Sequence, residues 1–382
     1  MREAILVRYG EITIKSKPVR RRMENTLLDN IKFMLERYGV EAELKLASGR
    51  IFIYTSNMKE ALKALSFVFG IVSFSPAIEV GNEYSELVRT AVDYAKKFLE
   101  PGDRFAVRAR RVKTLPYTSK DIEKDVGRSI LEEVNGVSVD LEEPDKVIYV
   151  EARTNKAYIF TEVYVGPGGL PYGVEGKVVA LISGGVDSAL ASYLMMRRGC
   201  EVVPIHFDMT PFYSIEARER FNRVIEWLRR YVPRREWRVY IVPLGEIHMK
   251  ADDIEPSLRC IFCKTMMLKI AERIALNESA EAIVTGDSLG QVATQTLSNI
   301  VFLTGRVKVP ILRPLVGLGK DDIVKMARRI GLAEVADVKV PPCKLIPQHP
   351  KTRAREEYED IFSKYYSLVD YALSNSKVKV IS

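Results

Sequence analysis

The sequence predicts an α/β protein in which a doubly wound parallel sheet follows two smaller α+β units. From residue 177 onward, short and wholly apolar runs alternate with helical segments, which is typical of parallel strands covered by helices on both faces. Residues 1–166 instead contain strands, helices and two hairpins. The segment GPGGLPYG at 166–173 separates the two patterns and is too rich in Gly and Pro to belong to either core. With 382 residues, the chain is also too long for one typical domain.

Two N-terminal domains are predicted, over residues 1–75 and 76–166. The first helix shows its pattern clearly, because apolar residues recur at three- and four-residue steps between Pro18 and Gly39. The elements of the first domain are, in order, a strand at 3–8, a helix from Val19 to Tyr38, a hairpin with arms 43–47 and 50–55 that turns at Ser48-Gly49, and a helix at 59–69. Those of the second are a helix at 83–99, a strand at 105–111, a helix at 119–134, and a hairpin with arms 147–153 and 157–165 that turns at Thr154-Asn155.

A linker at 167–175 leads to the third predicted domain, residues 176–382. Its elements are strands at 178–182, 202–207, 239–244 and 282–287, a helix that ends at Arg198, and helices at 214–231, from Lys264 onward and at 320–330. Ligands of doubly wound sheets bind beyond the carboxyl ends of the strands. We therefore expect the functional residues in the loops that follow these strands.

Composition narrows the class of protein. The net charge of +8 suits a polyanionic partner but does not establish one. No apolar run approaches the roughly 20 residues that a membrane span needs, and the N-terminus has no apolar signal core. We expect a cytoplasmic protein without a membrane partner. Of the four cysteines, Cys260, Cys263 and Cys343 form a CxxC pair plus a distant third, a spacing that favours metal or redox chemistry over disulfides.

The sharpest motif is Ser183-Gly184-Gly185-Val186-Asp187-Ser188, which lies between a predicted buried strand and a predicted helix. The two glycines allow a sharp turn that brings backbone N–H groups close to an anion, and the helix N-terminus adds unpaired donors. The motif therefore predicts a phosphate site. Neither GxxxxGK[ST] nor GxGxxG stands in this position, so the common mononucleotide and dinucleotide motifs do not apply.

This loop resembles the pyrophosphate loop, or PP-loop, of the ATP pyrophosphatase superfamily. Members adenylate a carbonyl oxygen of the substrate, expel pyrophosphate and let a nucleophile displace AMP. The resemblance implies an adenine nucleotide α-hydrolase-like fold, ATP as cofactor, and a catalytic Asp187 that holds Mg²⁺. For His206, a satisfied position in the core is an alternative to a role as base or ligand. The residues assigned to ATP are Leu181, Ile182, Ser183, Gly184, Gly185, Asp187, Ser188, His206, Phe207, Gly286, Gln295 and Arg313.

A second motif identifies the family more closely. The segment TGDSLGQVATQT at 285–296 closely resembles a signature of tRNA 4-thiouridine synthetases, which also carry RPL, here 313–315. RYGEI at 8–12 is similar to the ferredoxin-like domain of that family, although Ser16 stands where a Gly is usual. Residues 84–165 are similar to a THUMP domain, a module of tRNA-modifying enzymes. The resemblance thus covers nearly the whole chain.

The THUMP resemblance implies tRNA binding, and the sequence offers candidate residues for it. Alternate residues on one strand face carry positive charge, as do neighbours in the first helix, and such residues contact phosphates without reading bases. A solvated basic face is the alternative interpretation. The candidates are Arg108, Arg110, Lys113, Arg20 and Arg21.

The cysteines bear on the sulfur chemistry. Cys343 matches the catalytic cysteine in the PP-loop domain of the family, and Cys263 is a second catalytic candidate. By resemblance to archaeal members, which lack a rhodanese domain, Cys260, Cys263 and Cys343 would hold a [4Fe-4S] cluster with one iron open. Two alternatives stay open: a zinc site completed by His349 or water, and a metal-free persulfide–disulfide cycle of Cys263 and Cys343. Cys200 is expected to pack in the core.

The resemblance implies an ATP-dependent tRNA sulfurtransferase that makes 4-thiouridine at tRNA position eight through an adenylated uridine. It also implies a sulfur donor, either sulfide or a persulfide carrier, a homodimer, and a link to thiamine biosynthesis. One alternative is a tRNA thiolase that acts at another uridine. The other is a THUMP-containing tRNA-binding protein without turnover.

Overall fold

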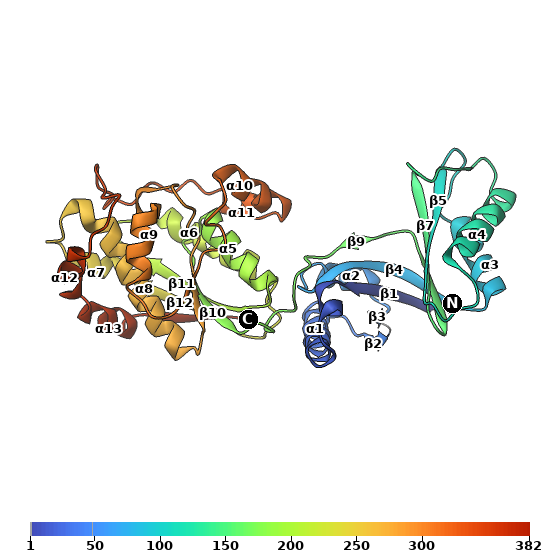
Figure 1. The fold of residues 1–382 in the computed structure, drawn as a ribbon, viewed down its shortest axis with the longest axis horizontal. Coiled ribbons are helices and arrows are strands. Elements are labelled where there is room, and N and C mark those ends of the chain that lie inside the picture. The colour runs from blue at the N-terminus through green and yellow to red at the C-terminus, as the bar shows by residue number, and fades with distance from the viewer. Residues whose placement is uncertain (1, 48) are drawn as a thin grey trace. The chain divides into compact units, whose positions relative to one another are not determined.

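A computed structural model describes residues 2–47 and 49–382, which form two compact units. The first unit ends at Gly169 and the second begins at Leu170. Figure 1 shows the helices and strands of each unit. Each unit has its own sheet, and the division falls inside the Gly/Pro-rich segment at 166–173.

The N-terminal unit is built on one sheet of nine strands within the described residues. Along the sheet the order is β2 (Glu43–Ala47), β3 (Arg50–Tyr54), β1 (Arg2–Tyr9), β4 (Ile71–Gly81), β8 (Lys156–Phe160), β7 (Lys146–Ala152), β5 (Arg104–Arg111) and β6 (Ser138–Val139), while β9 (Tyr164–Val165) pairs with β4. The long strand β4 pairs with β1 along most of its length and with β8 from Ile78 onward. It therefore joins the two α+β parts in one sheet and runs across the predicted boundary after residue 75, which stays a prediction.

The helices of this unit follow the apolar pattern of the sequence. They are η1 (Glu11–Ile14), α1 (Lys17–Arg37), α2 (Met58–Leu65), α3 (Tyr84–Ala95) and α4 (Ser119–Glu133). Helix α1 buries Leu27 and Ile31 completely and ends before Gly39, which has a positive φ of 68°. Thr118 and Asp121 form a capping box at the start of α4. The turn predicted at 48–49 includes Ser48, which lies outside the described residues.

The C-terminal unit has a six-stranded sheet in its described residues. The order is β14 (Ile311–Leu312), β13 (Ala282–Val284), β10 (Lys177–Leu181), β11 (Glu201–Asp208), β12 (Trp237–Pro243) and β15 (Lys377–Ile381). From β10 the chain adds β11 and β12 on one side, and then returns to add β13 and β14 on the other. The strand order therefore reverses at β10, the place where doubly wound sheets bind ligands. The edge strand β15, antiparallel to β12, was not predicted from the sequence.

Helices cover both faces of this sheet (Figure 1). Helices α5 (Val186–Arg197), α6 (Ile215–Arg229), α10 (Lys320–Arg329) and α11 (Ala333–Ala336) pack among themselves, as do α7 (Leu244–Lys250), α8 (Arg259–Asn277), α9 (Leu297–Thr304) and α13 (Ser367–Ser374). The remaining helices are η2 (Pro256–Leu258), η3 (Ala293–Gln295) and α12 (Glu357–Ser363). No helix among the described residues is long and apolar enough to cross a membrane.

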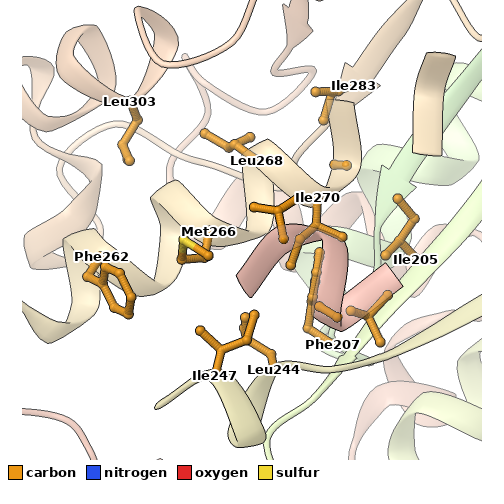
Figure 2. Packing of buried hydrophobic residues seen from close by; sticks show 14 of the residues in the cluster. Ile205, Phe207, Leu244, Ile247, Phe262, Met266, Leu268, Ile270, Ile283 and Leu303 are labelled. Atoms are coloured by element: carbon orange, nitrogen blue, oxygen red, sulfur yellow. The ribbon is translucent and has the colours of Figure 1, made fainter. Parts of the chain in front are cut away.

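Helix α8 begins earlier than predicted, and its first turn lies in the core. The sequence predicted a loop up to residue 263, but the helix starts at Arg259 because Ile261 and Phe262 are both buried. Figure 2 shows Phe262, Met266 and Ile270 along this helix, in one buried cluster that also contains the sheet residue Phe207. The centroid of the Phe262 ring lies 5.4 Å from that of the Phe362 ring on α12. The CxxC pair therefore stands on a rigid helical turn rather than in a loop.

Candidate functional site

The loop at 183–188, made of the turn after β10 and the first three residues of α5, lies at the point where the strand order reverses. Gly184 has a positive φ of 84°, and a Cβ there would lie 2.7 Å from the backbone nitrogen of Phe221. A Cβ on Gly286, in the loop after β13, would lie 2.6 Å from the backbone nitrogen of Ser188. A side chain at either position would force a shift, because the first loop packs closely against α6 at Gly184 and the second loop packs closely against the first at Gly286.

Hydroxyl groups hold the shape of the loop. The Ser188 hydroxyl accepts a hydrogen bond from the Ser183 N–H at 3.2 Å and donates to the Gly185 carbonyl at 3.0 Å. The Ser183 hydroxyl accepts from the Gly185 N–H at 3.3 Å. No side chain among the described residues caps the N-terminus of α5. Its first N–H groups are therefore available to an anion.

A cavity of about 340 Å³ lies at the ends of β10 and β11. Apolar side chains make up much of its wall, including Leu181, Phe207, Met209 and Met267. His206 also lines this cavity, with its Nδ1 3.0 Å from the Ile182 carbonyl oxygen. Burial lowers the pKa of His206, so the ring is neutral at pH 7. Such a wall suits a flat and mostly apolar group.

A second and more polar cavity of about 210 Å³ adjoins the first. Both are lined by Leu181, Ser183 and Met267. On one side of the second cavity, Lys320 Nζ lies 2.6 Å from Asp187 Oδ1, and Gln291 Nε2 lies 3.1 Å from Asp187 Oδ2. The structure thus brings the predicted Asp187 together with a cation from the start of α10.

Asp287 occupies the other side of this second cavity and is only 8% exposed. Its carboxylate accepts hydrogen bonds from Lys264 at 2.7 Å, Thr285 at 2.8 Å, Gln295 at 3.2 Å and Arg313 at 3.4 Å. Burial raises the pKa of Asp287, but these donors and cations outweigh it and hold the pKa below its ordinary value. The carboxylate is therefore ionised and fully paired. The predicted residues Gly286, Gln295 and Arg313 all line this cavity.

The three candidate cysteines lie close enough for the charge of one thiolate to affect the pKa of another. Cys260 and Cys263 stand on the first turns of α8, while the backbone N–H of Lys344, next to Cys343, donates to the Phe212 carbonyl at 3.0 Å. Burial, together with the charges of the two other thiols, raises the pKa of Cys263 to about 12. Among the described residues, however, no three His, Cys, Asp or Glu side chains already form a group that could hold a metal ion.

The predicted RNA contacts divide into two groups. Arg108 and Arg110 line a cavity of about 490 Å³ in the N-terminal unit, together with Arg8. Lys113 is exposed further along the chain, whereas Arg20 and Arg21 lie on α1 and do not line this cavity. Arg20 is paired with Glu24 at 2.7 Å.

Sequence reasoning missed several residues of these sites. Lys264 was seen only as the start of a helix, although its position directly after the CxxC pair was a usable signal. Asp287 belonged to a recognised motif but received no role of its own. In the N-terminal unit, nothing in the spacing indicated that Arg8 and Arg50 both bind Glu151.

Family models match most of the chain. Residues 173–368 match the model of the thiamine biosynthesis protein ThiI, residues 4–75 the ThiI ferredoxin-like domain, and residues 82–162 the THUMP domain.

Two similar proteins carry the name "Probable tRNA sulfurtransferase". The one from Methanocaldococcus jannaschii is 43% identical over 364 residues, which cover 92% of this chain and 94% of that protein. The one from Methanobrevibacter smithii is 40% identical over 358 residues, which cover 92% of each.

Two solved structures resemble this chain along most of its length. The crystal structure of a 4-thiouridine synthetase in complex with RNA and bound ATP matches with a TM-score of 0.89 and 30% identity, covering all of both chains. The structure of PH1313 from Pyrococcus horikoshii matches with a TM-score of 0.68 and 30% identity, covering 86% of this chain and all of that one.

Proposed function

The chain belongs to the ThiI family of tRNA sulfurtransferases, and we propose that it uses ATP to convert a uridine of tRNA to 4-thiouridine. The observation that carries the proposal is the pair of adjoining cavities that meet at Ser183, one apolar and one polar, where the strand order reverses. An adenine nucleotide has the same division into an apolar base and a charged phosphate chain.

The nucleotide is proposed to lie across Ser183. A volume of about 340 Å³ is within the usual range of small-molecule sites, and its walls of Phe207, Met209 and Met267 suit the adenine ring. The phosphates would then reach the loop at 183–188, where the first N–H groups of α5 and the helix dipole favour negative charge. His206, bound to the Ile182 carbonyl, would keep the two strand ends together under the base.

In the first chemical step, uracil O4 bonds to the α-phosphorus, the bond to pyrophosphate breaks and the N3 proton is released. Negative charge grows on the leaving pyrophosphate, so cations fixed near it lower the barrier. Lys264 and Arg313 line the polar cavity, and Lys320 is held there by Asp187. The Asp187 carboxylate is of the kind that Mg²⁺ binds together with substrate phosphates, and the ion would neutralise charge on the phosphates.

In the second step, sulfur bonds to C4 while the bond between C4 and the AMP oxygen breaks, so that AMP leaves. We propose that Cys260, Cys263 and Cys343 hold a [4Fe-4S] cluster, because clusters take thiolate ligands, Cys260 and Cys263 share the start of α8, and Cys263 and Cys343 pack against the same apolar cluster. When bound, such a cluster would supply iron to which the sulfur for transfer could bind. With a pKa of about 12, Cys263 as a free thiol is protonated at pH 7 and is therefore a weak nucleophile.

For the RNA partner, we propose the surface around the cavity of the N-terminal unit. Arg8, Arg108 and Arg110 line this cavity. The rings of Tyr149 and Phe160 also line it and stack on each other, with centroids 5.1 Å apart. Arginines of this kind bind phosphates with little regard to sequence, so affinity should fall steeply with salt. The finer expectations are proposed with it: action at tRNA position eight, a homodimer, a cytoplasmic location, a sulfide or persulfide donor, and a role in thiamine biosynthesis.

A single anoxic assay tests the function. Iron-reconstituted protein is mixed with ATP, Mg²⁺, sulfide and unmodified tRNA, and the digested RNA is analysed by nucleoside mass spectrometry. We expect 4-thiouridine only when both ATP and sulfide are present, with one AMP released per modified nucleoside. Mapping of the modified nucleotide distinguishes position eight from another uridine. ATP-independent tRNA binding without AMP release would contradict the proposal and favour a binding protein.

A further inference from the structure

Asp287 connects segments that lie far apart in the sequence. Lys264, on the first turns of α8, is 23 residues before it and donates at 2.7 Å, and Arg313, 26 residues after it, donates at 3.4 Å. The Nη2 group of Arg313 also donates a hydrogen bond to the Thr304 hydroxyl at 3.0 Å. A buried carboxylate with these donors fixes where both cations stand in the polar cavity.

Lys264 also belongs to the sulfur site, because it follows Cys263 directly in the chain. Its charge lowers the pKa of Cys260 and of Cys263, although burial outweighs it and both values stay raised. The same helical turn thus carries the two thiols and a cation that points into the polar cavity. Whatever holds Lys264 also holds this turn.

We propose that Asp287 is a positioning residue that anchors the CxxC turn of α8 to the nucleotide cavity through Lys264. This inference rests on the proposed function, since it assigns the two sides of the site to adenylation and sulfur transfer. The anchor keeps the thiols at a constant separation from the loop that binds the phosphates. It also holds Lys264 and Arg313 ready for the charge that develops on the leaving group, without reorganisation at the moment of reaction.

The substitution Asp287→Asn removes the charge but keeps the size of the side chain, and Asp287→Glu restores the charge. Glu278→Gln is a matched control, because Glu278 is also 8% exposed and binds Tyr240 at 2.6 Å and Arg238 at 2.9 Å. Glu278 follows the last residue of the 19-residue helix α8 and lies about 22 Å along it from Cys263, at 1.5 Å per residue. Asp287→Asn and Glu278→Gln each lose a buried ion pair, but only Asp287→Asn loses the ion pair with Lys264.

The first measurement uses the full-length protein without metal. Each cysteine is labelled with a maleimide under anoxic conditions, and the labelling rates are read by mass spectrometry. In Asp287→Asn we expect Cys260 and Cys263 to be labelled about tenfold faster, because the turn opens more often. Buried Cys200 serves as the internal reference and should not change. Equal rates for Cys260 and Cys263 in wild type and Asp287→Asn, or equal acceleration in Glu278→Gln, would overturn the anchor.

The second measurement follows AMP and 4-thiouridine in one tube with reconstituted protein. For Asp287→Asn we expect kcat for AMP release to fall about tenfold or more, while KM for ATP changes less than about threefold, because positioning acts in the transition state. Asp287→Glu should recover most of the loss. Tighter ATP binding with unchanged kcat would overturn the inference and reduce Asp287 to a counter-charge. Wild-type AMP release without 4-thiouridine would instead count against the proposed function, and the labelling rates would still decide the anchor.

Discussion

Replacing Glu151 by Gln should destabilise the N-terminal unit and weaken tRNA binding, even though the loss of a negative charge makes the net charge more positive by one. Glu151 is only 2% exposed and lies on β7. It binds Arg50 at 3.0 Å, Arg8 at 3.4 Å, and Arg153. Arg8 and Arg50 stand 143 and 101 residues away in the chain, on β1 and β3. The carboxylate therefore joins strands of the ferredoxin-like and THUMP parts.

The magnitude follows from burial. Removing one partner of a buried ion pair typically costs about 3–5 kcal/mol, because the remaining charges stay desolvated. Burial already lowers the pKa of Arg8 and Arg50, and the charge of Glu151 counteracts this effect. Without it, Arg8, Arg50 and nearby Arg110 repel one another, and Arg8 and Arg110 leave their positions around the cavity.

Hydrogen exchange and tRNA binding measure the two effects separately. A loss of 3–5 kcal/mol corresponds to about a hundredfold or more faster amide exchange in β1 and β7. Both tryptophans, Trp227 and Trp237, lie in the C-terminal unit, so its unfolding followed by fluorescence should stay unchanged. For tRNA, we expect lower affinity and a salt slope smaller by about 0.9 for each lost phosphate contact.

Exposed Glu132 on α4 provides the control, since Glu132→Gln changes the net charge by the same amount without breaking a buried ion pair. Simple Coulomb attraction predicts equal or tighter tRNA binding for both variants. If Glu151→Gln binds tRNA as tightly as Glu132→Gln, or if exchange in β1 and β7 changes less than about threefold, the reasoning from positioning fails.

Three further results are expected. Gly286→Ala should weaken ATP binding at least about tenfold in calorimetry, because the new Cβ would meet the Ser188 nitrogen at 2.6 Å and push the phosphate loop away; unchanged affinity would contradict this close packing. Single Ser variants of Cys260, Cys263 and Cys343 should each lose iron and visible absorbance after reconstitution. Zinc in place of iron in the wild-type protein would favour the zinc site. Full activity of all three variants would rule out the cluster. Acid should destabilise the N-terminal unit through Glu151. Burial raises the pKa of Glu151, but Arg50, Arg153 and Arg8 hold it below the ordinary 4.5. The contribution of this carboxylate to stability is therefore present above pH 4.5 and disappears as the pH falls through the lowered pKa. The corresponding slope in a pH series of hydrogen exchange should be absent from Glu151→Gln.

Local pattern was sufficient for much of the fold and for the shape of the loop that we propose binds phosphates. The strand, the loop at 183–188 and helix α5 follow one another without interruption, so their order alone specified a turn that presents N–H groups. The apolar runs from residue 177 onward likewise predicted the parallel strands, because strands buried on both faces need continuous apolar sequence. Recognition of Gly286, Gln295 and Arg313 as site residues came from motif resemblance, and the structure places all three on one cavity.

Pairings between distant segments came only with the tertiary structure. The contacts of Asp287 with Lys264 and of Glu151 with Arg8 span 23 and 143 residues, and no periodicity in the sequence records them. The start of α8 was misplaced for a related reason, since its first turn is stabilised by the burial of Ile261 and Phe262 and not by a local cap. Sequence spacing encodes which face of an element is apolar. Which charged groups meet depends on sheet order and on the packing of whole elements, and both arise only when the chain folds.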